Sequence, residues 1–432
     1  MSDILLINSK LNHESYKTIS PPLGIAYLCA SLRKNGISFE VFDCNLSQND
    51  IDNNDIDNIV LSMKQNGIVA FSCMTPNYNY TVELSKKVKS LRPDLLICLG
   101  GYHASLFAKE IIYSKAPFDV LIMGNGEDSI IQLCVDHKEK NYVCKPNIIY
   151  RVDRENADFH VHKTKWPNDI IPDRKGIFLE KYIELGSTFS GSVQFSRGCV
   201  YACNFCSVHH VEGCWMAGNV QQLLNEFEIL YNDFGLRKNI VIVDNLFTGN
   251  KQMVIDFCNL LMKNNMSLKW SCDARIDDID KELVVKMYQA GCVSYFVGLE
   301  SGYDETLKLI GNKPNKELVR QKLEMVNEIG MKVHGSFILG MPWENEESTM
   351  ETINYAVDLP LYTCEFSFAT PFPYTRLCRQ VEEYGAKIVD YNYDHWDGRT
   401  PVMSIPNISR NRLMELYLFA IAQKMRQNQK HN

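Results

Sequence analysis

Short apolar runs alternate with amphipathic stretches over the first 140 residues. The runs lie at 3–8, 39–43, 68–73, 95–101 and 118–124. Between them, segments such as 21–36 and 79–93 space their apolar residues at the helical period. Continuous apolar strands that alternate with helices are typical of a parallel sheet covered on both faces. We therefore predict a flavodoxin-like, Rossmann-like α/β domain over residues 1–140, with a ligand crevice at the carboxyl ends of its strands.

Polar and glycine-rich turns follow three of these predicted strands directly. Glycine lets the backbone approach a large, flat ligand closely, although tight turns between strand and helix explain any one of these sites equally well. Three such turns at one edge of a sheet favour a ligand. The candidate contacts are Ser72, Met74, Thr75, Gly100, Gly101, His103, Gly124, Gly126 and Glu127.

A second alternation begins at residue 191. Strand-like runs lie at 192–196, 239–245, 268–275, 293–301, 332–342 and 363–373, and helical patterns such as 315–330 separate them. Six such units predict a partial parallel barrel over 191–375, whose active-site groups lie at the carboxyl ends of the strands. The mixed, polar segment 141–190 predicts a linker. Residues 376–432 predict a helical, substrate-contacting region with an amphipathic helix over 411–427.

Composition narrows the possible functions. A chain of 432 residues is long enough for two or three domains. Its net charge of −7 argues against a nucleic-acid partner, and no apolar run reaches the roughly 18 residues of a membrane span. The first ten residues, MSDILLINSK, do not resemble a signal peptide. We expect a cytoplasmic protein that acts on a small molecule or a peptide, with no membrane partner.

Cysteine usage points to one chemical site. The chain has 15 cysteines, most of them single residues in apolar stretches, and one tight group in SRGCVYACNFCSVHH at 196–210. Cys199, Cys203 and Cys206 are spaced for metal binding rather than for a disulfide framework. A structural zinc ion needs a fourth ligand, which His209 or His210 would have to supply. Three thiolates also suit a [4Fe–4S] cluster whose fourth iron is open to a substrate or cofactor.

The CxxxCxxC motif after the first strand of a six-unit barrel resembles the radical S-adenosylmethionine (SAM) superfamily. The resemblance implies that the three cysteines bind a [4Fe–4S] cluster and that its open iron chelates the amino and carboxyl groups of SAM. It further implies that Phe205 lies against the adenine. The segment 337–342, FILGMP, resembles the stretch that runs beside the adenine, which places Ile338 and Gly340 there.

Other strand ends agree with this resemblance. Asp244 ends the second strand and matches the position that accepts the SAM ammonium group, and Arg275 follows the third strand. Both residues could instead serve in ion pairs or caps. Glu300 and Ser301, in a GLES segment, match positions near the methionine carboxylate or the ribose. TPFP at 370–373 resembles the sixth-strand motif, but Tyr374 stands where the family has glycine, which puts the local loop shape in question.

The segments PPLGIAYLCASLRKNG, SCMT, GGYHAS and GNGE resemble the cobalamin-binding domain of cobalamin-dependent radical SAM enzymes, the class B methyltransferases among them. The DxHxxG motif that supplies a cobalt ligand is absent, so we expect His103 to pack near the corrin rather than to ligate cobalt. The implied reaction is C-methylation. A 5′-deoxyadenosyl radical abstracts hydrogen from an unactivated carbon, and methylcobalamin donates the methyl group. The implied electron donor is a flavodoxin or ferredoxin.

Several alternatives stay open on the sequence. The same scaffold could catalyse cyclisation or rearrangement without methyl transfer. A methylthiotransferase would need a second cluster, for which Cys29, Cys44 and Cys73 are the available cysteines. A cobalamin-based sensor would need no cluster at all. In the C-terminal region, the aromatic group Tyr391, Tyr393, His395 and Trp396 predicts either substrate-contacting loops or ordinary packing.

Overall fold

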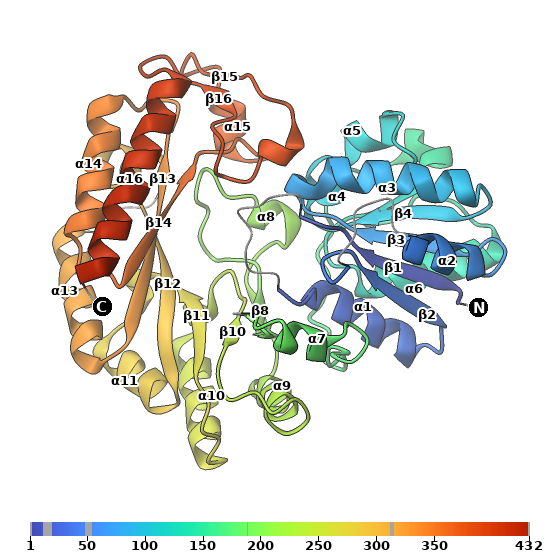
Figure 1. The fold of residues 1–432 in the computed structure, drawn as a ribbon, viewed down its shortest axis with the longest axis horizontal. Helices are drawn as coiled ribbons and strands as arrows, with labels where there is room; N and C mark the ends of the chain where they lie inside the picture. Colours follow the sequence, from blue (N-terminus) through green and yellow to red (C-terminus); the bar gives the residue numbers. More distant parts are fainter. Residues whose placement is uncertain (1, 12–19, 48–53, 188, 312–314, 431–432) are drawn as a thin grey trace. The chain divides into compact units, whose positions relative to one another are not determined.

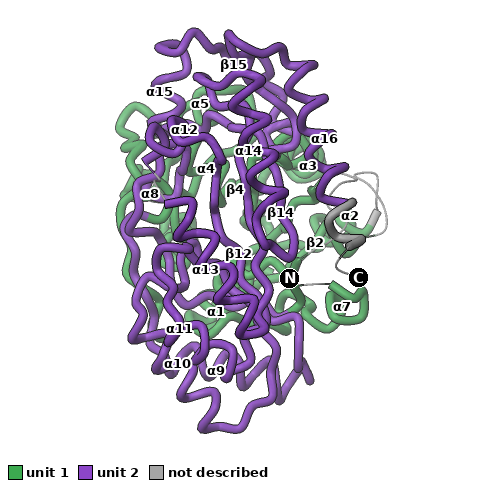
Figure 2. Tube along the Cα trace, turned by 90° about the vertical axis from the view of Figure 1, so that its left-hand side faces the viewer, with its two compact units in different colours: residues 1–190, 210–212 green, residues 191–209, 213–432 purple. Residues whose placement is uncertain are grey.

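The computed structural model describes residues 2–11, 20–47, 54–187, 189–311 and 315–430. The chain divides into two compact units, which Figure 2 shows in different colours. Unit 1 comprises residues 1–190 and 210–212, and unit 2 comprises residues 191–209 and 213–432. No helix within the described ranges combines the length and the apolar character that crossing a membrane requires.

Unit 1 contains a six-stranded sheet in the order β2-β1-β3-β4-β5-β6, of which Figure 1 labels β1 to β4. The first five strands are parallel and follow the predicted runs. They are β1 (Ile4–Asn8), β2 (Phe39–Asp43), β3 (Ile68–Ser72), β4 (Leu96–Gly100) and β5 (Val120–Ile122). This strand order confirms the prediction of a flavodoxin-like fold, in which ligands bind at the carboxyl edge near the reversal of strand order between β1 and β3.

Helices cover both faces of this sheet. On one face, α1 (Leu23–Lys34) and α6 (Glu127–Glu139) bury Ile25, Cys29 and Leu133 against strand residues such as Leu6 and Ala70. On the other face lie α2 (Asn54–Ser62) and α3 (Tyr78–Leu91), as Figure 1 shows. The short helices α4 (Tyr102–Leu106) and α5 (Ala108–Tyr113) follow β4. Two covered faces explain why the strands are apolar throughout rather than alternating.

The segment 141–190, for which the sequence predicts a linker, belongs to unit 1. Its strand β6 (Ile148–Tyr150) pairs antiparallel with β5 and extends the sheet. The 3₁₀ turn η2 (Arg151–Asn156) follows β6, and the Arg151 guanidinium donates to carbonyl oxygens around the start of β5, including that of Phe118 at 2.7 Å. Farther on, α7 (Leu179–Glu184) places the Tyr182 hydroxyl 2.5 Å from Asp43 Oδ2 at the end of β2.

Unit 2 contains six parallel strands in sequential order, from β7 to β14. They are β7 (Gly191–Val193), β10 (Ile240–Ile242), β11 (Trp270–Ala274), β12 (Cys292–Glu300), β13 (Lys332–Leu339) and β14 (Thr363–Phe368). Every predicted strand of the second alternation is present, so the expected six-unit parallel arrangement is confirmed.

Helices pack along one side of these strands, each in contact with the next along much of the series (Figure 1). They are α9 (Val220–Asn232), α10 (Lys251–Lys263), α11 (Lys281–Gln289), α13 (Lys316–Ile329), α14 (Glu346–Asp358) and α16 (Arg410–Lys430). Trp270 of β11 lies at the centre of an aromatic cluster with Phe227, Phe247 and Phe257, at ring distances of 5.8 to 6.4 Å. This cluster packs α9 and α10 against β11.

Shorter elements connect or extend these layers. They are η1 (Thr75–Asn77), β8 (Ser196–Arg197), α8 (Val208–Val211), β9 (Met216–Ala217), η3 (Phe247–Gly249), η4 (Ile276–Asp278), α12 (Asp304–Leu309), α15 (Arg376–Gln380), β15 (Lys387–Ile388), η5 (Tyr393–His395) and β16 (Met403–Ser404). The predicted helix at 411–427 is present within α16. The rest of the C-terminal region is not purely helical, because β15 and β16 pair antiparallel.

Candidate cofactor sites

The three cysteines of the motif lie on a loop that begins at the carboxyl end of the first strand of unit 2. The hairpin β8–β9 closes this loop, with Ser196 opposite Ala217 and Arg197 opposite Met216. Cys199, Cys203 and Cys206 are half-buried free thiols. We call residues 198–207 the cysteine loop. Its place agrees with the expectation that chemistry in such a fold lies at the carboxyl ends of strands.

The three thiols influence one another and respond to the same charged neighbours. Burial raises the pKa of Cys203, while the Arg275 guanidinium lowers it and Glu300 and Cys199 raise it. Burial raises the pKa of Cys206 to about 11, with further contributions from Cys203 and Cys199. Gathered thiols beside a fixed cation fit an iron–sulfur cluster, which binds thiolates and favours nearby positive charge.

A single-ion site is not formed on this loop. Within the described part of the chain, no three His, Cys, Asp or Glu side chains lie close enough together to hold one metal ion. The His209 ring nitrogen Nε2 contacts the Tyr201 carbonyl oxygen at 2.6 Å, and the His210 ring lies edge-on to His160 within unit 1. A four-iron cluster differs from zinc in this respect, because each thiolate binds a different iron and need not converge on one point.

Two residues between the cysteines anchor the loop. Asn204 is 3% exposed, and its backbone N–H donates to the Ile310 carbonyl at 3.0 Å while its own carbonyl accepts from the Leu377 N–H at 2.9 Å. The Tyr201 hydroxyl donates to Asp278 Oδ1 at 2.5 Å, and burial together with that carboxylate raises the pKa of Tyr201 to about 12. No role was predicted for either residue from the sequence. Only their tertiary contacts distinguish them.

Asp244 and Arg275 have different surroundings. Asp244 is 1% exposed, and its carboxylate accepts from the Phe195 N–H at 2.8 Å and from the Ser196 hydroxyl at 2.7 Å. Burial raises its pKa to about 7. These hydrogen bonds fit the alternative role, in which Asp244 caps nearby backbone and side-chain groups. A contact of Asp244 with SAM stays a prediction. Arg275 Nη1 lies 3.9 Å from Cys203 Sγ, so the structure brings Arg275 to the cysteine loop.

The side chains of Glu300 and Ser301, in the GLES segment, have different surroundings. Glu300 is half-buried with a φ of +65°, and burial raises the pKa of its carboxyl group to about 7. Its charge affects Cys203 and Cys206, so it lies near the cysteine loop. Ser301 is fully buried, with its hydroxyl 2.9 Å from that of Thr352 on α14. In this structure Ser301 therefore serves packing, and its cofactor contact stays a prediction.

The predicted adenine segment depends on a residue that the sequence analysis missed. Glu344 is 1% exposed, and its Oε2 accepts from the N–H groups of Gly340 at 2.9 Å and Met341 at 3.1 Å. Its Oε1 accepts from the Thr306 hydroxyl at 3.0 Å. Glu344 thus fixes the turn after β13. Ile338 and Phe205 are half-buried side chains, and their adenine contacts stay predictions.

In unit 1, the candidate turns lie together at the carboxyl edge of β3, β4 and β5. Met74 is 48% exposed, Ser72 and Gly100 are half-buried, and Thr75 is buried. Ser72 pairs with Gly100 in adjacent strands. The edge thus presents backbone and short side chains beside an exposed thioether, which fits a large, flat cofactor such as a corrin.

Two glycines at this edge also satisfy internal packing. Gly101 has a φ of +97°, and a Cβ there would lie 2.5 Å from the Cys73 carbonyl oxygen. Gly124 has a φ of +63°, and a Cβ there would lie 2.8 Å from a Val161 methyl group. Tight turns therefore account for both glycines without a ligand. Gly126 is half-buried and Glu127 is buried at the start of α6, and their ligand contacts stay predictions.

His103 lies inside unit 1. Its side chain is fully buried and stacks on Phe107 at a ring distance of 4.5 Å, with Tyr78 at 4.0 Å on a tilted ring. Its Nδ1 lies 3.3 Å from the Thr75 hydroxyl. Burial lowers the pKa of His103 to about 3, so the ring is neutral at physiological pH. Through these contacts, His103 packs inside unit 1 next to the turn that contains Thr75.

The remaining sequence alternatives gain little from the structure. Cys29, Cys44 and Cys73 are at most 2% exposed, and burial raises the pKa of each thiol. All three are enclosed within unit 1, and the Cys73 thiol contacts Asn77 Oδ1 at 3.3 Å. Trp396 is 4% exposed and packs on Phe372 at a ring distance of 5.8 Å. For this residue the contacts are those of ordinary aromatic packing. Tyr391, at 72% exposed, is the outward-facing member.

Comparisons with known proteins match both parts of the chain. The family model of the B12 binding domain matches residues 10–133, and that of the radical SAM superfamily matches residues 193–356. An uncharacterized methyltransferase of Pyrococcus horikoshii is 27% identical over 409 residues, covering 92% of this chain and 86% of the relative. An anaerobic magnesium-protoporphyrin IX monomethyl ester cyclase of Rubrivivax gelatinosus is 23% identical, covering 91% and 72%.

Among solved structures, the radical SAM methyltransferase TsrM from Kitasatospora setae, with cobalamin and a [4Fe–4S] cluster bound, has the same fold. Its TM-score is 0.74 at 16% identity, covering 99% of this chain and 91% of TsrM. At this identity the likeness is one of fold. It extends through both units, so the order of the two domains is shared as well.

Proposed function

The chain combines a B12-binding domain with a radical SAM domain, and we propose that it is a cobalamin-dependent radical SAM C-methyltransferase. The observation that supports this most directly is the cysteine loop: three free thiols on one loop, at the carboxyl end of a six-stranded parallel arrangement, with Arg275 and Glu300 beside them. The substrate we propose is a small molecule or a peptide with an unactivated carbon.

When bound, the [4Fe–4S] cluster, SAM and cobalamin would together supply hydrogen abstraction by a 5′-deoxyadenosyl radical and a methyl group for the substrate carbon. The residues of this chain bind and orient these groups. Cys199, Cys203 and Cys206 would hold the cluster through three of its irons. Arg275 keeps a cation at Cys203, and Glu344 keeps the turn at Gly340 in place for a cofactor beside β13.

Unit 1 would hold cobalamin at the carboxyl edge of β3 to β5. Met74 offers an exposed apolar surface there, and the turns at Gly101 and Gly124 keep bulky side chains away. His103 is buried and neutral, so it would support the edge without reaching the ligand. A flavodoxin or ferredoxin is the electron donor we propose for the cluster.

A second candidate function has support from one comparison. The cyclase of Rubrivivax gelatinosus aligns with 91% of this chain, so a ring-forming or rearrangement reaction on the same scaffold is the alternative. SAM labelled in its methyl group distinguishes the two, because only a methyltransferase places the label in the product.

The test of the proposal is a triple variant, Cys199→Ala, Cys203→Ala and Cys206→Ala, purified without oxygen. We expect iron and sulfide to fall to background and the formation of 5′-deoxyadenosine from SAM to stop, while cobalamin binding persists. Cys214→Ala is the matched control, because Cys214 is an exposed cysteine a few residues beyond the motif. Formation of 5′-deoxyadenosine by the triple variant would show that the assignment of the cluster is wrong.

A further inference from the structure

Tyr201 lies in the middle of the cysteine loop and contacts three groups at once. Its backbone N–H donates to Cys199 Sγ at 3.4 Å, and its hydroxyl donates to Asp278 Oδ1 at 2.5 Å. The Arg275 guanidinium carbon lies 3.8 Å from the centre of its ring. A tyrosine ring attracts a cation over its face, and the hydroxyl is bound by a carboxylate, so both ends of this side chain are held.

Arg275 is fixed by contacts in different directions. Its Nη1 reaches Cys203 Sγ at 3.9 Å, its Nη2 pairs with Asp277 Oδ2 at 2.9 Å, and its plane lies over the Tyr201 ring. A planar guanidinium is suited to such a combination of stacking and directed hydrogen bonds. The result is a cation whose distance to one proposed cluster ligand is set by its neighbours.

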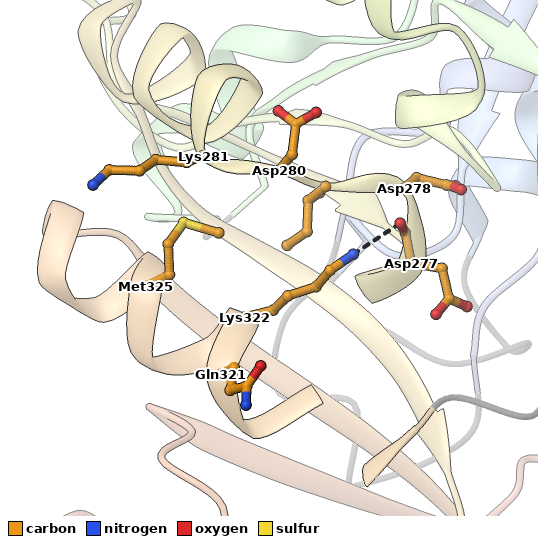
Figure 3. Close-up of a pocket in the computed structure, with 8 residues that line it drawn as sticks. Asp277, Asp278, Asp280, Lys281, Gln321, Lys322 and Met325 are labelled. Carbon is orange, nitrogen blue, oxygen red and sulfur yellow. Dashed lines mark hydrogen bonds between the residues drawn. The ribbon is translucent and has the colours of Figure 1, made fainter. Parts of the chain in front are cut away.

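The short turn η4 supplies both carboxylates of this arrangement. Asp277 contacts Arg275, and the adjacent Asp278 accepts the Tyr201 hydroxyl. On the far side of the turn, Lys322 extends from α13 toward η4, as Figure 3 shows, and its Nζ donates to the carbonyl oxygens of Ile276 and Asp277 at 2.9 Å each. Residues of η4 and α13 line an open hollow of about 360 Å³ there.

Resting on the proposed function of the cysteine loop, we propose that Tyr201 is a positioning residue: with η4, it holds the Arg275 guanidinium against Cys203 and so sets the reduction potential of the bound cluster. The potential of an iron–sulfur cluster depends on nearby charge and on hydrogen bonds to its sulfur ligands. A reduced cluster carries one more negative charge, so a fixed cation at one thiolate stabilises the reduced form and raises the potential.

The experiment compares three variants with the wild-type holoenzyme. Tyr201→Leu removes the ring and the hydroxyl, whereas Tyr201→Phe breaks the hydroxyl–carboxylate bond and keeps the ring and every charge. Tyr362→Leu is the matched control, because Lys332 lies 3.9 Å from the centre of the Tyr362 ring in the same unit without contact to the cysteine loop. Each protein is loaded with cluster without oxygen, assayed for iron and sulfide, and titrated by redox potential with detection by electron paramagnetic resonance.

We expect the midpoint potential of Tyr201→Leu to move to more negative values and the resonance of its reduced cluster to change shape. Tyr201→Phe should shift in the same direction by less, and Tyr362→Leu should match the wild type. A merely structural role for Tyr201 would change cluster content without moving the potential of the clusters that form.

The outcomes separate the inference from the proposed function. If Tyr201→Leu binds a full cluster at the wild-type potential, the inference is wrong and the proposed function is unaffected. If Tyr201→Leu cannot hold a cluster, Tyr201→Phe decides, and a wild-type potential in that variant would overturn the inference. If the wild-type protein binds no iron and sulfide, the proposed function itself fails.

Discussion

Four carboxyl groups of unit 2 have raised pKa values. Asp244, Asp273, Glu300 and Glu344 all have pKa values raised to about 7, with burial as the main cause. Such groups are costly to ionise, and strongly shifted groups at strand ends are typical of functional sites. Of the four, Asp244 and Glu300 were identified from the sequence. Asp273 and Glu344 were missed, because neither stands in a segment with a recognisable resemblance.

Glu344 gives a pH-dependent prediction. In the folded protein its carboxyl group stays protonated up to about pH 7, whereas in the unfolded chain it ionises near its ordinary pKa of 4.5. Its contribution to stability is therefore complete below about pH 4.5 and is lost as the pH rises to about 7. Glu344→Gln has no such loss. We expect the unfolding free energy of the wild type relative to this variant to fall by about 3 kcal/mol across that range.

Thermal unfolding of the cluster-free proteins at about pH 5 and about pH 8 measures this difference. The exposed Glu347, also near the start of α14, supplies the control Glu347→Gln. If the difference between the wild type and Glu344→Gln is constant with pH, Glu344 has the same charge in the folded and unfolded states.

At the scale of elements, β6 shows what the apolar pattern does not reveal. Its three residues are too few for a periodic signal, and the antiparallel pairing with β5 is a tertiary contact. A buried network holds it: the Tyr150 hydroxyl donates to Asp136 Oδ2 at 2.9 Å, Gln132 Nε2 donates to Asp136 Oδ1 at 2.8 Å, and Lys145 pairs with the same carboxylate.

Tyr150→Phe tests how strongly this network stabilises β6. The variant leaves one oxygen of the buried Asp136 carboxylate without its donor, so we expect a loss of about 1–3 kcal/mol in the free energy of unfolding of unit 1. Tyr113→Phe is the control, because Tyr113 is 47% exposed and its hydroxyl makes a long contact of 3.4 Å. Urea unfolding, followed by far-ultraviolet circular dichroism, measures the stability of both variants. Equal midpoints for the two variants would show that the Asp136 network contributes nothing measurable.

At the scale of the whole molecule, each proposed cofactor site belongs to one unit. The cysteine loop lies in unit 2, and the turns at the edge of β3 to β5 lie in unit 1. The chain passes between the units more than once, because residues 210–212, just beyond the cysteine loop, belong to unit 1. There the Glu212 carboxylate accepts from the Tyr102 hydroxyl next to Gly101.

Separate sites predict separate losses. Gly101→Val places a side chain against the Cys73 carbonyl and should lower the cobalt content per chain several-fold, while iron and sulfide per chain stay at wild-type values. Gly36→Val is the matched control, because Gly36 also has a positive φ, of +66°, but open space around it. Cobalt, iron and inorganic sulfide are measured in the same preparations. Loss of iron together with cobalt in Gly101→Val would contradict independent sites.

The sequence by itself determined the two sheets and the cysteine motif. Strand positions follow from local apolar periodicity, and five strands of unit 1 and six of unit 2 lie where that pattern predicts them. The spacing of Cys199, Cys203 and Cys206 is likewise a property of adjacent residues. Burial and spacing along one segment leave a direct trace in its composition.

Only the tertiary structure decided which side chains meet. Asn204 bonds to residues more than 100 positions away, Tyr201 bonds to Asp278, and the Ser301 hydroxyl contacts that of Thr352 on α14. Glycines expected at a ligand also fill internal contacts. Such pairings depend on how strands and helices converge in space, and a residue's own neighbours in the chain carry no record of them.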